Sequence, residues 1–503
     1  MFEFSAGTRD AALDRMGDDL LDVLVIGGGV TGCGVALDAA TRGLSTALVE
    51  RDDFASGTSG RSSRLIHGGL RYLQTGDLGV VYESLREREI LRRLAPHLVR
   101  PLANFVPAVR PQHRIPLRTG LLIYETLAWG RNIRRHRVIG SAEGRRLAPG
   151  LAKPSGGIVY YDCRTDDARL TVEVARAAAR AGALVANHAA VEAIDRGTNE
   201  YRITVRDRLG DGTRSVRART VVNAGGVWAE SVQALADSTP VRLQPSKGVH
   251  LVFRAEDLPI HAALGVRSGA HDGRFVFLIP WGPRVYAGTT DTPFTGSLDD
   301  PGVDEDDREY ILHGVNRAFG TSLTFEDTTA SWAGLRPLLA KAASKATRDI
   351  SRRHVILEDP PRMLTVTGGK LTTYRQMAED VTDRVCGLLD APVRCRTDRV
   401  PLGLSRPYLT EAGRAATEAE RLGLDPDSGR RMVNRFGDDW SVALELIRQD
   451  SALGEPLVEG LPPLRVEVPL SHERDMAMTD EDVLVRRTRL TTLDAKLASQ
   501  VRL

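Results

Sequence analysis

Three glycines near the start of the chain have the type and spacing that suit a phosphate-binding turn. Gly27, Gly29 and Gly32 follow a short apolar strand in the pattern G-x-G-x-x-G, and a helix-like segment comes after them. In such a unit one glycine makes a tight turn, one admits a pyrophosphate and one lets the helix pack closely on the strand. The helix N-terminus adds unpaired N–H groups and a partial positive charge. A second apolar strand ends in Glu50, whose carboxylate can accept hydrogen bonds from a ribose diol. The unit predicts a dinucleotide site, because an ordinary glycine-rich turn leaves the acid unexplained.

Three further segments combine residues that could surround a flat ring system. Residues 59–72 are rich in serine, glycine, histidine and arginine, and small residues allow backbone to lie against a ring. Residues 331–338 have the sequence S-W-A-G-L-R-P-L, and residues 368–375 have the sequence G-G-K-L-T-T-Y-R. In the last segment the glycines precede a helix whose N-terminus could point at a cofactor. Taken singly, each segment could equally be a structural turn, and residues 59–72 could be a surface loop followed by a strand.

The elements that must position these residues are those of an α/β protein. Helices are expected at residues 77–95 and 167–182, and a buried strand at residues 220–226. A hairpin closed by residues 210–212 is expected to precede that strand. Short alternating strands at residues 241–295 predict an antiparallel sheet inserted into the first domain.

Length, charge and cysteine use exclude several classes of protein. A chain of 503 residues exceeds the usual size of a single core, so two or three domains are expected. The net charge of +2 gives no case for a nucleic-acid partner. Four scattered cysteines indicate a reducing compartment, and we expect no bound metal. The N-terminus does not have the pattern of a secretory signal, and no run of about 18 uncharged apolar residues occurs. We therefore expect a cytoplasmic protein.

Seven motifs, taken together and in this order, carry a resemblance to a known family. They are S-S-R-L-I-H-G-G-L-R-Y (62–72), V-N-A-G-G-V-W (222–228), S-K-G-V-H (246–250), G-T-T-D-T (288–292), W-A-G-L-R-P-L (332–338), G-G-K-L-T-T-Y-R (368–375) and D-V-L-V-R-R-T-R-L (482–490). The chain resembles the flavin-dependent glycerol-3-phosphate dehydrogenases of the D-amino-acid-oxidase-like group. The I-H-G-G-L-R-Y motif is specific to that family, whereas many unrelated enzymes share the glycine fingerprint. Residues 425–470 contain no recognisable motif.

The resemblance implies a domain organisation. We expect a Rossmann-like FAD-binding domain with an inserted antiparallel-sheet substrate domain, together spanning residues 18–385, and a C-terminal helical domain at residues 395–503. The FAD-binding segments are expected at about 18–100, 150–235 and 330–385, and the substrate or cap segments at about 100–150 and 236–330.

The resemblance also implies an activity and a cofactor. Such an enzyme oxidises sn-glycerol 3-phosphate at its secondary alcohol to dihydroxyacetone phosphate, passes the hydride to FAD and delivers the electrons to a membrane quinone. Glu50 is expected on the adenosine ribose. The full set of implied FAD-binding residues is Gly27, Gly28, Gly29, Thr31, Gly32, Glu50, Arg51, Ser59, Ser62, Ser63, Leu65, His67, Gly68, Gly69, Ala224, Gly225, Gly368, Gly369, Lys370, Leu371 and Thr372.

The substrate phosphate carries nearly two negative charges, so cations with forked or mobile donors should line its pocket. The expected substrate-binding residues are Arg71, Tyr72, Arg336, Arg348, Lys370 and Thr372. The hydroxyl proton must also leave, and histidine has a suitable pKa without tuning. His67 and His250 are the two candidates for this base, although His67 could equally serve only as a hydrogen-bond partner of the flavin or backbone. Arg336 and Lys370 are expected to polarise the alcohol and hold the phosphate.

Basic residues flank the apolar segment at residues 120–129. They are Arg110, Arg114, Arg118, Arg131, Arg134, Arg135 and Arg137. This pattern suits anionic lipid headgroups, and it also suits a solvated face or a funnel that attracts phosphate. We expect peripheral attachment at the inner face of the cell membrane, with a membrane quinone as acceptor and a homodimer as assembly.

Three other functions compete with this interpretation. An amino-acid oxidase of the same fold would bind a carboxylate through an arginine and would not need several cations. A nicotinamide dehydrogenase does not usually recruit segments more than 300 residues downstream of its first glycine turn. A non-catalytic flavin-binding protein would not need the substrate residues that the motifs contain.

Overall fold

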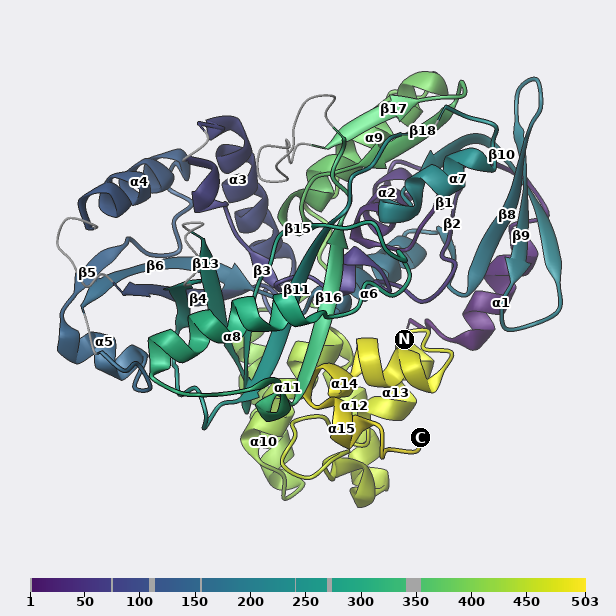
Figure 1. The fold of residues 1–503 in the computed structure, drawn as a ribbon. Helices are drawn as coiled ribbons and strands as arrows, with labels where there is room; N and C mark the ends of the chain where they lie inside the picture. Colours follow the sequence, from purple (N-terminus) through teal and green to yellow (C-terminus); the bar gives the residue numbers. More distant parts are fainter. Residues whose placement is uncertain are drawn as a thin grey trace.

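Figure 1 shows a molecule with two sheet-based parts and a helical C-terminal part. The structure is a computed structural model that describes residues 2–73, 76–107, 114–153, 156–239, 241–268, 274–340 and 354–503, without the side chains of Arg71, Arg114 and Pro116. Arg110 and Arg348, both singled out by the sequence, lie outside the described residues. Within the described part of the chain, no helix is long and apolar enough to cross a membrane.

The first sheet contains the glycine unit in a largely parallel arrangement. Its path runs β17-β18-β10-β1-β2-β7, and β9 and then β8 continue antiparallel from β10. The loops after the parallel strands meet at one edge of the sheet, where ligands bind in this fold class. The strands are β1 (Leu20–Ile26), β2 (Thr46–Val49), β7 (Leu184–Ala186), β8 (Ala189–Arg196), β9 (Tyr201–Asp207), β10 (Thr213–Asn223), β17 (Val355–Glu358) and β18 (Met363–Thr367).

Strand β1 alternates its side chains between two cores, as a strand with both faces covered must. Val23 and Val25 pack into the larger core with residues of four helices. Leu24 and Ile26 face the core under α1 and the β8–β9 hairpin. The hairpin expected at residues 210–212 is confirmed between β9 and β10. The helices are α1 (Ala6–Arg15), α2 (Val30–Thr41), α6 (Asp167–Arg180), α7 (Ala229–Ala234) and α9 (Tyr374–Leu388).

The second sheet is mostly antiparallel and confirms the expected inserted part. Its path runs β15-β11-β14-β13-β12-β4-β6-β3, with β16 on β11 and β5 on β6. Its apolar face packs against α8 (Glu305–Phe319). The strands are β3 (Leu65–Ile66), β4 (Arg100–Pro107), β5 (Arg137–Ile139), β6 (Gly157–Arg164), β11 (Ser246–Arg254), β12 (Ala263–Arg267), β13 (Phe275–Trp281), β14 (Arg284–Gly288), β15 (Thr292–Pro293) and β16 (Ala330–Arg336). Three helices, α3 (Leu78–Leu94), α4 (Arg114–Leu127) and α5 (Ser141–Leu147), lie on the same side of the molecule (Figure 1).

The C-terminal part is helical, and the tract without motifs forms much of its core. Phe436, the last residue of α11, packs there against Trp440 and Leu444 of α12. The helices are α10 (Tyr408–Arg421), α11 (Pro426–Phe436), α12 (Trp440–Gln449), α13 (Glu467–Arg474), α14 (Leu490–Leu493) and α15 (Ala495–Ala498), with a π-helical turn at Asp482–Arg487.

Candidate functional site

A cavity of about 1820 Å³ is lined by residues of both sheets. Of the residues singled out by the sequence, those on its wall are Gly27, Gly29, Thr31, Glu50, Arg51, Ser59, Ser62, Ser63, Leu65, His67, Gly69, Tyr72, Ala224, Gly225, Arg336, Gly368, Gly369, Lys370, Leu371 and Thr372. Gly28, Gly32, Gly68 and His250 are not lining residues. The Arg71 side chain and the whole of Arg348 lie outside the described residues. Segments from positions 27 to 372 thus meet at one site.

The three fingerprint glycines have different geometric tasks. Gly27 has φ +114°, and a Cβ there would lie 2.6 Å from the Ala224 carbonyl oxygen, so it makes the tight turn. A Cβ on Gly32 would lie 1.9 Å from the Gly27 oxygen, so this glycine permits close packing of helix on strand. Gly29 meets only the Ser59 hydroxyl, at 3.2 Å, which leaves its backbone accessible from the cavity. This arrangement accommodates a pyrophosphate at the start of α2.

Glu50 stands at the carboxyl end of β2, on the cavity wall. One of its oxygens accepts the Gly28 N–H at 2.5 Å and the other accepts the Asp52 N–H at 2.8 Å. Burial raises the pKa of this carboxyl group, and the two backbone donors oppose that rise. The Arg51 guanidinium carbon lies 4.9 Å from the ring centre of Trp228, which also lines the cavity. The Trp228 Nε1 has no hydrogen-bond partner among the described residues. These residues fit the adenosine half of FAD.

The segment after β18 closes the other side of the fingerprint edge. Gly368 and Gly369 adopt φ values of +80° and +74°, a left-handed conformation that glycine adopts without strain. Thr372 is buried below this turn, and its hydroxyl accepts the His67 N–H at 3.1 Å. The β3 segment and the Gly368–Thr372 turn are therefore bonded directly to each other across 305 positions of sequence.

Cationic groups occupy another part of the same wall. The Arg336 guanidinium donates to the Thr289 hydroxyl at 3.2 Å and lies 3.5 Å from an Asp291 oxygen. Lys370 Nζ lies 3.8 Å from the centre of the Tyr72 ring and 3.1 Å from the Ser84 hydroxyl. A cavity with a guanidinium, an ammonium and a phenol on its wall is suited to a phosphorylated polyol.

The two candidate histidines have different environments. His67 is half-buried and lines the cavity. His250 is buried on β11, stacked on Trp332 with ring centres 4.7 Å apart, and its Nε2 lies 2.9 Å from the hydroxyl of Ser63. Burial, reinforced by the charges of Arg336 and Arg64, holds the pKa of His250 well below its ordinary value. His250 therefore contacts the cavity wall through Ser63.

Several lining residues were missed by the sequence reasoning. Lys153, Arg267, Arg274, Asp291, Arg317 and Trp228 all line the cavity. The basic residues among them lie outside the quoted motifs and are spread between positions 153 and 317, so only the folded chain brings them together. Trp228 and Asp291 belong to two of the quoted motifs and could have been found there.

Two family descriptions match the chain. Residues 22–382 match the family described as "FAD dependent oxidoreductase". Residues 395–502 match the family described as "C-terminal domain of alpha-glycerophosphate oxidase".

Curated relatives resemble the chain over nearly its full length. "Glycerol-3-phosphate dehydrogenase 2" of Mycobacterium tuberculosis is 39% identical over 490 residues, which cover 96% of this chain and 83% of the relative. "Alpha-glycerophosphate oxidase" of Streptococcus pyogenes is 32% identical over 97% of this chain and 90% of the relative.

Solved structures agree with these relatives. The glycerol-3-phosphate dehydrogenase of Bacillus halodurans, complexed with FAD, has a TM-score of 0.80 and 32% identity, covering 99% of this chain and 91% of that one. Glycine oxidase from Geobacillus kaustophilus shares the fold alone, with 20% identity and a TM-score of 0.57. The match covers 77% of this chain and 99% of that one. The chain therefore belongs to the FAD-dependent glycerol-3-phosphate dehydrogenase family.

Proposed function

We propose that the chain oxidises sn-glycerol 3-phosphate to dihydroxyacetone phosphate. One observation carries the proposal: Tyr72, Arg336 and Lys370 lie on the wall of the same cavity as the FAD fingerprint. FAD, when bound, supplies the acceptor for the hydride of the secondary alcohol. The named relatives are dehydrogenases or oxidases of this substrate, which supports the assignment.

The cations have two tasks in this reaction. Arg336 offers a planar fork of donors to the phosphate, and Lys370 offers a mobile ammonium group. Charge-assisted hydrogen bonds of this kind also polarise the alcohol oxygen as the hydride leaves. Tyr72 and Thr372, which carry hydroxyl groups, line the same cavity. We propose all four as substrate-binding residues, together with Arg71 and Arg348.

We propose His67 as the base that accepts the hydroxyl proton, because it lines the cavity directly. His250 is the second candidate and would act through the Ser63 hydroxyl, to which its Nε2 is bonded. In either case the proton moves to an imidazole nitrogen while Arg336 and Lys370 hold the phosphate. The remaining FAD residues named from the sequence are proposed to keep their cofactor roles.

The test is an anaerobic titration of the purified protein followed by its visible spectrum. Glycerol 3-phosphate should bleach the yellow absorbance of the bound flavin, and glycerol without the phosphate should not do so at the same concentration. Amino acids serve as the second control, since the alternative function is that of an amino-acid oxidase. Bleaching by an amino acid and none by glycerol 3-phosphate would replace our assignment with that alternative.

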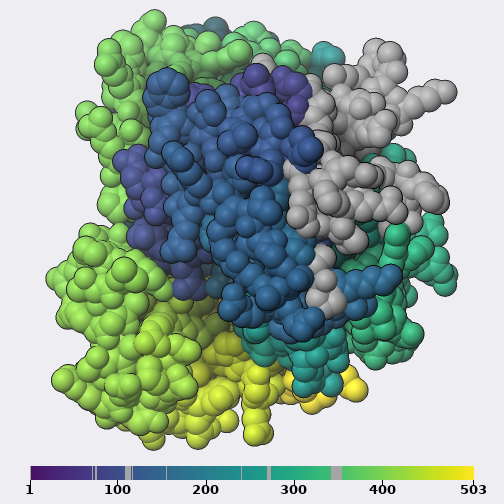
Figure 2. Space-filling model, turned by 90° about the vertical axis from the view of Figure 1, so that its left-hand side faces the viewer, coloured from purple at the N-terminus to yellow at the C-terminus, as the bar shows by residue number. Residues whose placement is uncertain are grey.

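For the electron acceptor we propose a membrane quinone, reached at a peripheral membrane face on the cytoplasmic side. Helix α4 supports this proposal, because Ile115 and Leu122 are 71% and 53% exposed and Trp129, just beyond it, is 80% exposed. Arg118 and Arg134, which are close to these residues in the sequence, are also exposed. Figure 2 faces this side of the molecule. Other residues of α4, such as Leu117 and Ile123, line the cavity, so one helix joins the apolar face to the site.

Sedimentation with anionic phosphatidylglycerol vesicles tests the membrane proposal. The Ile115→Ser/Leu122→Ser/Trp129→Ser variant should lose binding, because apolar burial in the interface supplies the affinity. Leu409→Ser is the matched control, since Leu409 is 83% exposed on α10 and should not contribute. Absence of binding by the parent protein at low salt would refute peripheral attachment. The proposed homodimer is tested separately by light scattering.

A further inference from the structure

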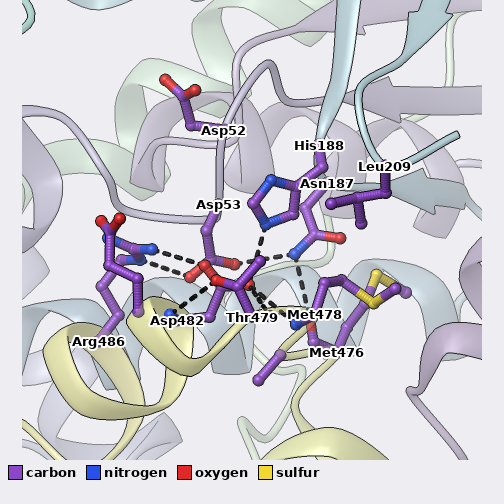
Figure 3. Close-up of polar contacts among 12 residues, drawn as sticks. Asp52, Asp53, Asn187, His188, Leu209, Met476, Met478, Thr479, Asp482 and Arg486 are labelled. Atoms are coloured by element: carbon purple, nitrogen blue, oxygen red, sulfur yellow. Dashed lines mark hydrogen bonds and ion pairs between the residues drawn. The ribbon is translucent and has the colours of Figure 1, made fainter.

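A buried cluster of charges joins the C-terminal part to the loop that follows Glu50 (Figure 3). The Asp53 carboxylate is fully buried and accepts four hydrogen bonds. Arg486 Nε and Arg487 Nη1 donate to one oxygen at 2.6 Å each. Arg487 Nη2 and Asn187 Nδ2 donate to the other at 2.9 Å each. An acid of the FAD-binding part is thus neutralised by residues 433 and 434 positions downstream.

The same cluster contains the ligand types of a metal site, but its oxygens already accept hydrogen bonds from protein donors. Asp53, His188 and Asp482 place ligand atoms within 4.8 Å of one another. Asp482 accepts hydrogen bonds from His188 Nε2 at 2.9 Å and from Arg486 at 2.6 Å. Two guanidinium groups balance the two carboxylates, so the charges cancel without a cation. The cluster therefore fastens two parts of the chain to each other.

The loop that carries Asp53 is bonded on its other side to the glycine fingerprint. The Ala55 N–H donates to the Gly28 carbonyl at 3.1 Å, and Glu50 accepts the Gly28 N–H. The Phe54 ring is fully buried, and a Cβ on Gly28 would lie 2.9 Å from it. The loop is therefore held between the phosphate-binding turn and the two arginines.

A third arginine of the C-terminal part holds the continuation of this loop. Arg489 donates to the Gly60 carbonyl at 3.1 Å and to Asp167 at 2.6 Å. The other oxygen of Asp167 accepts the N–H and hydroxyl of Ser62 at 2.9 and 2.7 Å. Ser62 lines the cavity, whereas none of the described residues beyond position 377 does. The C-terminal part thus contacts the loop from behind.

We propose that Arg486 and Arg487 are positioning residues for FAD, so that the C-terminal part completes the cofactor site without touching the cofactor. Without Arg487 the buried Asp53 carboxylate would lose two of its four donors and one of its two countercharges, and removing a countercharge from a buried carboxylate is strongly unfavourable. The loop would then open to hydrate the acid. Glu50 and Gly28 would move with it, because both are bonded to this loop.

The test measures the FAD dissociation constant of the full-length apoprotein by flavin fluorescence. Arg487→Met should weaken FAD binding by about tenfold or more, within the range of coupling between buried partners. Arg448→Met is the matched control, because this arginine lies on α12 of the same part and its side chain is 48% exposed. The Asp53→Asn/Arg487→Met double variant should return the constant to within about threefold of the parent, because the acid that needs the countercharge is gone.

A merely structural role would lower the melting temperature of apoprotein Arg487→Met while its folded fraction bound FAD normally. An unchanged dissociation constant, or a double variant that binds no better than Arg487→Met, would overturn the proposal. Should Arg487→Met not fold, the double variant decides: near-parental binding supports the proposal and a larger loss contradicts it. Substrate is absent from the measurement, so its outcome is independent of the oxidation proposed above.

Discussion

His67 and His250 differ in burial and in the groups that their ring nitrogens can contact. His67 lines the cavity, whereas His250 is bonded to Ser63 and its Nδ1 has no hydrogen-bond partner among the described residues. The low pKa of His250 keeps its imidazole neutral, the form a base needs, but only the Ser63 hydroxyl connects it to the cavity. Sequence alone names both histidines, and their depth in the fold distinguishes them.

For the proton-accepting step we predict that His67→Asn slows anaerobic flavin reduction by roughly a hundredfold, the contribution typical of a general base. His250→Asn should slow it much less. Stopped-flow absorbance at saturating glycerol 3-phosphate measures both rates. A normal rate in His67→Asn together with a slow one in His250→Asn would transfer the role to His250 acting through Ser63. Normal rates in both would exclude either histidine as the base.

For the phosphate we predict that Arg336→Gln raises KM for glycerol 3-phosphate by about 10- to 100-fold, because hydrogen bonds to charged groups contribute roughly 1.5–3 kcal/mol. The preference for glycerol 3-phosphate over glycerol should fall with it. Arg254→Gln is the control, since Arg254 ends the strand β11 next to β16 but its side chain is 61% exposed. Steady-state kinetics with a soluble dye acceptor checks both variants. An unchanged ratio between the two substrates would remove Arg336 from the phosphate site.

At the scale of elements, the strand–glycine–helix unit was predictable because its residues are close in sequence. The same holds for α3, whose cap Asp77 and end before Pro96 are local signals. The antiparallel sheet was predictable as a type, but its strand order was not, because β4 and β6 join it from the first third of the chain. Arg267 and Arg274 reach the cavity only through that order, so no local pattern could have identified them.

One prediction concerns the packing of α2 on β1. Gly32→Ala should abolish FAD retention and destabilise the protein by about 1–3 kcal/mol, because a Cβ there would overlap the Gly27 oxygen. Gly413→Ala, in the middle of α10, has open space around the new methyl group and should stabilise by about 0.5–1 kcal/mol. Thermal unfolding and the flavin content after purification measure both effects. Gly32→Ala protein that retains a full complement of FAD would contradict this packing argument.

At the scale of the whole molecule, the burial of an ionisable side chain between separate elements sets acid sensitivity. His97 is buried among Glu173, Arg169, Arg176 and Arg100, and its two ring nitrogens have no hydrogen-bond partner among the described residues. Burial lowers the pKa of His97 from 6.5 to about 3. This environment depends on α6 residues that follow His97 by more than 70 positions, which is why the sequence did not predict it.

We predict the pH dependence from the sign of that shift. A folded pKa below the unfolded one gives stability that is complete above pH 6.5 and decreases as the pH falls towards 3. Protonation of this histidine in the unfolded state lowers the free energy of unfolding by about 1.4 kcal/mol per pH unit. The loss is about 2 kcal/mol between pH 7 and 5. His97→Leu should remove this contribution to the pH dependence of the free energy of unfolding. His261→Gln, at an exposed position, should leave the pH dependence unchanged. Denaturant unfolding of the FAD-loaded protein at both pH values gives the slopes, and equal slopes in parent and His97→Leu would refute the assignment.

The parallel pairing of β10 with β18 has a consequence for biosynthesis. The ribosome delivers β1 and the fingerprint early, but β18 and the Gly368–Thr372 turn follow only after more than 300 further residues. Synthesis at about 5–20 residues per second separates the two by tens of seconds. During that interval the nascent chain has the phosphate-binding turn without the opposite wall of the cavity. Cofactor loading therefore belongs to the last stage of translation or to the released chain, and a supply of free FAD matters most at that stage.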